Sequence, residues 1–203
     1  MTPASDIASS RPLGVAEGLG SPMLDEAIIF SRPVVLTGER ETLATQNGRC
    51  CLLDSIRLLS RIVGPLVVVL PAGLAELEAE VRQLAHRVWT PGTVNVVVEG
   101  APVAMDSAVA ILNVGMGVNA HLPWTAINSN GWVARVSSGP TALPSDTDQS
   151  NPVAALMAAS FGATEVFKRV FGIPSDLAPL LDATQFSLFE LSASPTGLGP
   201  PLP

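Results

Sequence analysis

Short runs of valine and leucine recur along the first half of this chain and are separated by helical patterns. The runs at 33–38, 65–71 and 93–100 are apolar enough for buried strands. Between them, residues 47–64 and 74–88 carry apolar side chains at intervals of three and four, the spacing of an amphipathic helix. Strands that alternate with helices in this way indicate an α/β fold with a mainly parallel sheet.

The second half of the chain adds strands of another kind. A further strand is expected at 107–115, and Ser-Asn-Gly at 129–131 lies between two apolar runs, which is a strong hairpin signal. A last strand is predicted at 186–192. We therefore expect a Rossmann-like, mainly parallel sheet with helices on both faces and a late antiparallel hairpin.

Residues 151–172 contain the clearest helix of the sequence. Asn151 is a good N-cap, and Pro152 suits the first helical position, where its missing N–H costs nothing. Gly172 is expected as a left-handed C-cap, and Pro174 prevents continuation. The helix is therefore predicted to begin at Pro152 and to end before Gly172.

The surroundings of this helix are constrained by its composition. Residues 153–161 are apolar in all directions, yet the stretch is too short to cross a bilayer, so we expect an internal helix. Its charges lie in the last third, where Glu165 and Arg169 are expected to pair on the one wet face. The sheet, a neighbouring helix or a second subunit should cover the rest.

The length and charge of the chain limit the classes of function. The 203 residues suggest one domain, and a charged fraction of only 14% suggests that a partner or more chain covers part of the surface. The net charge is −7 with no basic run, so no nucleic-acid partner is expected.

The ends and the cysteines bear on location. Residues 1–22 are expected to be a mobile arm, 23–192 the α/β domain, and 193–203 a linker-like tail. Cys50 and Cys51 are adjacent and are the only cysteines, which excludes a disulfide framework. Without a signal peptide or an apolar run of membrane-spanning length, we expect a cytoplasmic protein with no membrane partner.

The loop after the first strand is the expected ligand site of a doubly wound fold. In this chain residues 38–48 keep Gly38 and Gly48, but long side chains fill the space between them. Arg40 would attract a phosphate group, whereas the two glutamates beside it would repel one. An ordinary surface loop is the alternative interpretation.

A second candidate lies at 111–119, ILNVGMGVN, where a strand is expected to end. Asn113 and Gly115 could contact a ligand there, because sheet ligands collect at strand carboxyl ends. The stretch has no carboxylate for Mg²⁺, and Asp106 precedes the strand, so it is expected at the wrong end. A plain turn from strand to loop is again the alternative.

Neither catalytic residues nor a metal site are predicted. His86 and His121 with two adjacent cysteines make no zinc spacing, and no G-x-S-x-G nucleophile motif is present. A reactive cysteine would need a base or a cation nearby, and only Arg49 adjoins the pair.

The order of elements resembles the adenylating fold of the ThiF/MoeB/HesA family, the relatives of ubiquitin-activating enzymes. The stretch LPWTAINSNGWVARVSSG is followed by the helix ALMAASFGATEVFKRV, which is similar to the family's small-residue-rich helix. Glu165, Val166 and Lys168 occupy the positions expected from that family. The resemblance covers about residues 33–172 and implies a nucleotide-binding sheet with this helix near a dimer interface.

The chain departs from the family in its catalytic parts. VLTGERETLATQNG stands in place of a G-x-G-G-x-G loop, and Pro71-Ala72-Gly73 in place of the acidic residue after the second strand. ILNVGMGVN lacks the aspartate that holds Mg²⁺, and residues 137–150 contain no cysteine. These departures resemble a pseudo-adenylation module, for which no cofactor is expected.

Three functions remain open at this point. The first is a non-catalytic ThiF-like module that forms a homo- or heterodimer with an adenylating domain and helps to position a ubiquitin-like protein. The second is an active adenylyltransferase using ATP and Mg²⁺, in which Arg40 and the N–H groups near Gly48 replace the glycine-rich cradle. The third is a Rossmann-like binder of another small ligand at Gly38, Asn113 and Gly115.

Overall fold

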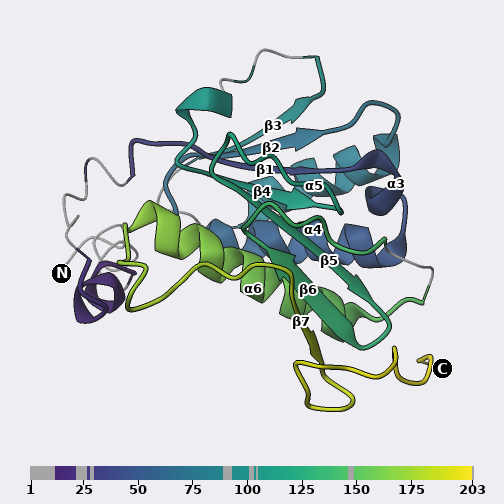
Figure 1. The fold of residues 1–203 in the computed structure, drawn as a ribbon. Coiled ribbons are helices and arrows are strands. Elements are labelled where there is room, and N and C mark those ends of the chain that lie inside the picture. Colours follow the sequence, from purple (N-terminus) through teal and green to yellow (C-terminus); the bar gives the residue numbers. More distant parts are fainter. Residues whose placement is uncertain are drawn as a thin grey trace.

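A computed structural model of the chain describes residues 12–21, 27, 30–88, 93–100, 103, 105–145 and 149–202. Among these residues a seven-stranded sheet forms the centre of the fold, in the order β3-β2-β1-β4-β5-β6-β7 (Figure 1). The strands are β1 (Val34–Gly38), β2 (Leu66–Leu70), β3 (Val94–Val98), β4 (Ala110–Val114), β5 (Trp124–Asn130), β6 (Val133–Ser137) and β7 (Thr184–Ser187). The strands from β3 to β5 are parallel, and β6 and β7 are antiparallel. The predicted α/β fold with a mainly parallel sheet and a late antiparallel hairpin is confirmed.

The hairpin and the last strand differ slightly from the sequence prediction. Asn130 pairs with Val133, so Gly131 and Trp132 form the connection between β5 and β6, one residue later than expected. Gly131 has a φ of 53°, a left-handed conformation that glycine adopts without a steric penalty. The last strand begins at Thr184 and ends at Ser187, earlier than the predicted 186–192.

Within the described residues, four α-helices and one 3₁₀ helix connect or follow these strands. They are α3 (Arg40–Leu43), α4 (Gln46–Leu59), α5 (Ala75–Arg87), η1 (Met105–Ser107) and α6 (Pro152–Val170). The short helix α3 was not predicted and lies inside the stretch expected to be a loop. The caps of α6 are as predicted: the side chain of Asn151 accepts hydrogen bonds from the N–H groups of Val153 and Ala154, and Gly172 has a φ of 60°.

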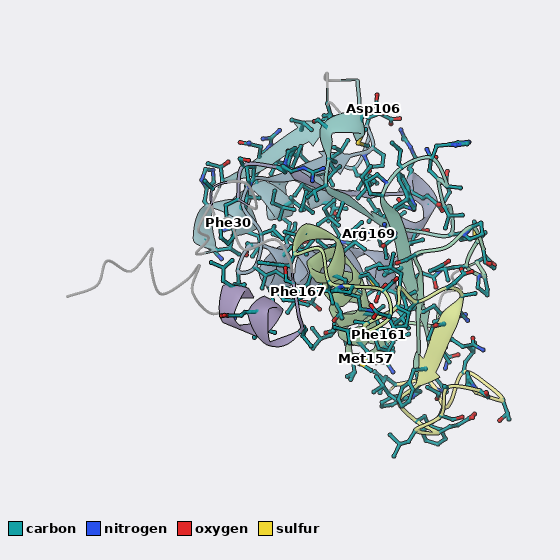
Figure 2. All side chains as sticks on the ribbon, turned by 60° about the vertical axis from the view of Figure 1, so that its left-hand side comes forward. Phe30, Asp106, Met157, Phe161, Phe167 and Arg169 are labelled. Atoms are coloured by element: carbon teal, nitrogen blue, oxygen red, sulfur yellow. The ribbon has the colours of Figure 1, made fainter. Side chains whose placement is uncertain are left out.

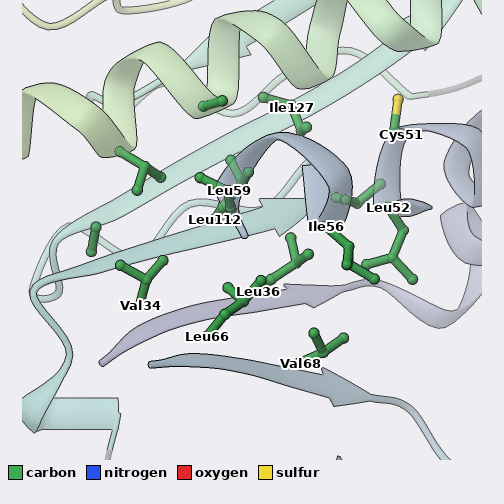
Figure 3. Packing of buried hydrophobic residues seen from close by; sticks show 14 of the residues in the cluster. Val34, Leu36, Cys51, Leu52, Ile56, Leu59, Leu66, Val68, Leu112 and Ile127 are labelled. Atoms are coloured by element: carbon green, nitrogen blue, oxygen red, sulfur yellow. The ribbon is translucent and has the colours of Figure 1, made fainter. Parts of the chain in front are cut away.

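The three long helices gather on one face of the sheet. Leu36, Leu66 and Val68 belong to one buried cluster with Leu52 and Ile56 of α4 (Figure 3). The same cluster includes buried residues of α5 and α6. Since side chains alternate between the faces of a strand, all these helices cover the face to which Leu36 points.

The other face carries shorter segments. Val35 and Ile111 point to it and pack with Ala108, while Val103 and Met105 lie against them. The connection from β3 to β4 therefore crosses this face with η1 instead of a long helix. The three long helices therefore lie on one face, and the other face carries only η1 and loop residues among those described. Loops follow the carboxyl ends of the strands.

Helix α6 is buried on one side and open on the other. Ala155, Ala158 and Ala159 are fully buried, and α6 packs side by side with α4. The expectation of burial on all sides is wrong for this single chain, because Val153 is 49% exposed and Leu156 is 47% exposed.

The predicted ion pair of α6 is also wrong. Glu165 is fully buried and pairs with Lys168, with 2.6 Å between carboxylate oxygen and ammonium nitrogen. Its other oxygen accepts hydrogen bonds from the N–H of Leu181 and the hydroxyl of Ser138. Arg169 donates instead to main-chain carbonyls, and burial lowers the pKa of its guanidinium. The chain near Leu181 therefore covers the face of α6 that was expected to be exposed to solvent.

The two ends of the described chain pack onto the domain. The predicted arm 1–22 lies partly outside the described residues, but 12–18 are helical, Ala16 is fully buried, and the hydroxyl of Ser21 donates to the carbonyl of Phe171. In the predicted tail 193–203, the carbonyls of Leu198 and Pro200 accept hydrogen bonds from Trp132.

Candidate functional site

The strand order reverses between β1 and β4, which places a crevice at their carboxyl ends. The two strands pair in parallel, with Gly38 beside Val114. The chain then leaves in opposite directions, toward α3 after β1 and toward β5 after β4. Such a switch point is where open α/β sheets bind their ligands.

The side chain of Glu39 lies in this crevice. One oxygen of its carboxylate accepts the main-chain N–H of Gly117 at 2.6 Å and that of Met116 at 3.1 Å. The N–H of Glu39 itself donates to the carbonyl of Val114. Consecutive N–H groups that point to one oxygen form an anion-binding site. Here the bound anion is a carboxylate of the chain itself.

The glycines after β4 are needed for this arrangement. A Cβ at Gly115 would overlap the carboxyl group of Glu39, and a Cβ at Gly117 would lie 2.8 Å from its oxygen. The carbonyl of Gly117 accepts hydrogen bonds from Asn113 at 3.2 Å and from the indole N–H of Trp124 at 2.8 Å. The loop is therefore held in the conformation that presents its N–H groups to Glu39.

Helix α3 fills the space above the end of β1. Leu43 is buried, and a Cβ at Gly38 would meet its Cδ1 at 2.8 Å. A phosphate-binding turn needs its glycine backbone open to the ligand. At this position the leucine side chain covers the glycine.

The first turn of α4 is also closed to a ligand, because other parts of the chain contact it. The hydroxyl of Thr45 accepts the N–H of Gly48 at 3.0 Å and so forms the N-cap. The carbonyl of Thr42 lies so close to Gly48 that a Cβ there would overlap it. The N–H of Gly48 is thus satisfied within the protein, and α3 packs against this end of the helix.

The predicted site residues are only partly brought together. Gly38, Asn113 and Gly115 lie at the crevice between β1 and β4. Arg40 is exposed, and its guanidinium lies against Gly73 in the loop after β2. Gly48 lies behind α3, in the first turn of α4.

This crevice does not fit a nucleotide phosphate in its present conformation. The carboxylate of Glu39 holds the N–H groups that could bind an anion, and it would repel a phosphate. Asp106 lies in η1 before β4, at the amino end of the strand as expected. Among the described residues, no cluster of three histidine, cysteine or acidic side chains could hold a metal ion.

The surroundings of the two cysteines do not favour the thiolate form. Burial raises the pKa of the Cys50 thiol, and the carboxylate of Asp54 raises it further. Cys51 is buried, and its sulfur lies 3.5 Å from the carbonyl of Ala155. A higher pKa means less thiolate at neutral pH, and the thiolate is the reactive form.

We expect native protein to react slowly with a thiol reagent at pH 7.5, at Cys50 alone. Cys51 should react only after unfolding, because it has no exposed surface. Mass spectrometry after timed alkylation measures both rates, and Cys50→Ala provides the control. Labelling of Cys50 as fast as a free thiol peptide would contradict the raised pKa.

Sequence reasoning missed Glu39, Leu43 and Trp124 as parts of this crevice. It treated Glu39 only as a group that would repel phosphate. The Gly-Met-Gly sequence after β4 was the available signal, since two closely spaced glycines indicate a close approach by another group. Which group approaches depends on the β1–β4 pairing, and that pairing is not local in sequence.

No family model and no curated protein matches this sequence.

Within the described part of the chain, no helix is long and apolar enough to cross a bilayer. The expected cytoplasmic location stays a prediction.

Proposed function

We propose that this chain is a catalytically inactive module of the ThiF/MoeB/HesA type, whose function is to pair with an active adenylating domain. One observation is the main support for catalytic inactivity. The carboxylate of Glu39 occupies the N–H groups of Met116 and Gly117 at the switch point, where a nucleotide-binding relative would need an open crevice. Leu43 over Gly38 supports it independently.

An exposed apolar surface on α6 supports the proposed pairing with an adenylating domain. Val153 and Leu156 are about half exposed, although both are large and apolar. Further along the helix, Phe167 lines a groove of about 430 Å³ between α6, the end of α4 and the N-terminal helical residues. Figure 2 shows Phe167 along α6 with Met157 and Phe161. Large exposed apolar side chains and a mainly apolar groove on the same helix are features expected of an interaction site.

The resemblance of the α6 sequence to the family's small-residue-rich helix supplies the identity of the partner. The low charged fraction of 14% agrees with a chain that has covered surface in its working state. A homodimer or a heterodimer would serve, and a ubiquitin-like protein would then be positioned by the assembled pair.

The test combines binding with an exchange assay. Mixed with an active adenylating domain of this family, the chain should form a complex in gel filtration, and Leu156→Lys should weaken it about tenfold or more. Leu191→Lys is the matched control, because Leu191 is 77% exposed and lies in the segment after β7 and not on α6. ATP–pyrophosphate exchange should come from the partner alone. Exchange catalysed by this chain on its own, or no complex at all, would overturn the proposal.

A further inference from the structure

Strand β3 forms one edge of the described sheet, and its own residues do not protect it against pairing. It bonds to β2 alone, and it lies at the top of the sheet in Figure 1. Its sequence from Val94 to Val98 is VNVVV, with neither a charge nor a proline. Natural edge strands usually carry a charge, a proline or a bulge that prevents further strands from adding.

The hydrogen-bonding groups of alternate residues in β3 point away from the sheet. Thr93 and Glu99, just outside the two ends, bond to the main chain of β2. In a parallel ladder the residues that bond to one neighbour alternate along the strand. The N–H and C=O groups of Val94, Val96 and Val98 therefore point to the open edge.

A groove of about 610 Å³ borders this edge and extends over the neighbouring face of the sheet, where Val35 and Ser107 also line it. Val67, Val97 and Val103 contribute apolar side chains to its lining. Among the described lining residues, Arg82 and His86 of α5 are the only charged or titratable ones. The groove therefore suits an extended, apolar segment that carries an acidic residue at one end.

We propose that β3 pairs in antiparallel orientation with β3 of a second copy of this chain, about a two-fold axis at Val96. Val96 then faces Val96 of the second copy, and Val94 faces its Val98. Each facing pair exchanges both N–H···O bonds, since these residues all present their main-chain groups outward. The interface is isologous, as expected for a two-fold dimer.

Charge favours a second copy as the occupant of this edge. Glu99 follows β3 directly and is exposed. In the antiparallel arrangement, Glu99 of one copy lies opposite Thr93 of the other, near the end of α5, where His86 and Arg87 are exposed. The sequence VNVVVE thus supplies both the apolar strand and the acidic end that the groove requires.

One existing contact must break for this pairing. The guanidinium of Arg82 donates to the carbonyl of Val96 at 3.2 Å. Its side chain is 47% exposed and also pairs with Glu78, so release from the carbonyl costs little. The strand is short, and we expect a weak dimer whose population depends on concentration.

Sedimentation velocity of the purified chain over a concentration series tests the pairing. Wild type should show a monomer–dimer equilibrium. Val96→Pro, which removes an outward N–H without breaking a bond to β2, should raise the dissociation constant about tenfold or more. Val96→Lys should do the same, and Leu191→Lys should leave the constant unchanged. A monomer at every concentration, or a dimer indifferent to both Val96 variants, would overturn the proposal.

Hydrogen exchange on wild-type protein gives a second readout that needs no variant. The amides of Val96 and Val98 should become protected as the concentration rises, while Asn95 and Val97 are protected throughout. Glu99→Arg should weaken the dimer, and His86→Glu in the same chain should restore it. Protection independent of concentration would contradict the pairing. The β3 edge is at the opposite end of the sheet from β6 and β7, so this result is separate from the test on α6.

Discussion

Replacing Glu165 by alanine should lower the free energy of unfolding by about 3–5 kcal/mol. The carboxylate has no exposed surface, and the Lys168 side chain that pairs with it is only 13% exposed. The substitution leaves the ammonium group partly buried without its anion, and it removes the acceptor for the N–H of Leu181. Urea denaturation measures the loss. Glu78→Ala is the matched control, because the Glu78–Arg82 pair is largely exposed and should contribute about 0.5 kcal/mol or less.

A double substitution separates the pair from its surroundings. Glu165→Met with Lys168→Met removes both charges, and it should recover a large part of the stability lost in Glu165→Ala. The recovery will be incomplete, because the main chain at Leu181 and the hydroxyl of Ser138 lose a partner in both variants. If Glu165→Ala were no more destabilising than Glu78→Ala, the buried position of the carboxylate would be contradicted.

Replacing Glu39 by alanine should lower the free energy of unfolding by about 1–3 kcal/mol, the range for a hydrogen-bonded charged group that leaves its partners unsatisfied. The N–H groups of Met116 and Gly117 would lose their acceptor. Glu39→Gln keeps an acceptor oxygen without the charge, so its loss should be smaller. Glu41→Ala, two residues away and exposed, should change stability little.

The Glu39 variant should also gain an anion site. With the carboxylate gone, inorganic phosphate could accept the same two N–H groups and stabilise the variant in proportion to its occupancy. Melting curves of wild type, Glu39→Ala and Glu41→Ala in phosphate, at matched ionic strength, measure this. A phosphate response equal in all three proteins would show that the N–H groups of Met116 and Gly117 are not the binding site.

The elements that could be predicted from the sequence are those fixed by local chemistry. Asn151, Pro152 and Gly172 delimit α6 because a cap and a left-handed glycine act on adjacent residues. The buried strands and the core face of α4, including Leu52 and Ile56, follow from periodicity.

The failures concern contacts between distant segments. Glu165 was expected to be exposed to solvent because it is charged. The segment at Leu181, sixteen residues later in the chain, covers it. Helix α6 was expected to be covered all round, yet Leu156 is about half exposed. Periodicity identifies which residues share a helix face, but it does not say what covers that face.

The candidate site shows the same limit. Gly38, Asn113 and Gly115 were predicted as site residues because strand ends are where ligands bind in this fold class, and they lie at the crevice between β1 and β4. The role of Glu39 could not be predicted, because it depends on the loop 77 and 78 residues further on at Met116 and Gly117. From the sequence, Glu39 was treated as a group that repels phosphate. In the folded protein its carboxylate is itself the anion that the N–H groups of Met116 and Gly117 bind.

Thermal unfolding of the wild-type chain with and without millimolar MgATP tests the central claim most directly. A ligand that binds only the folded state at 100 times its Kd adds about 2.7 kcal/mol, which is an easily measured shift. Because Glu39 and Leu43 fill the switch point, we expect the melting temperature to be the same in both conditions. A clear, saturable increase with MgATP would mean that the crevice opens to nucleotide, and it would contradict the inactive module.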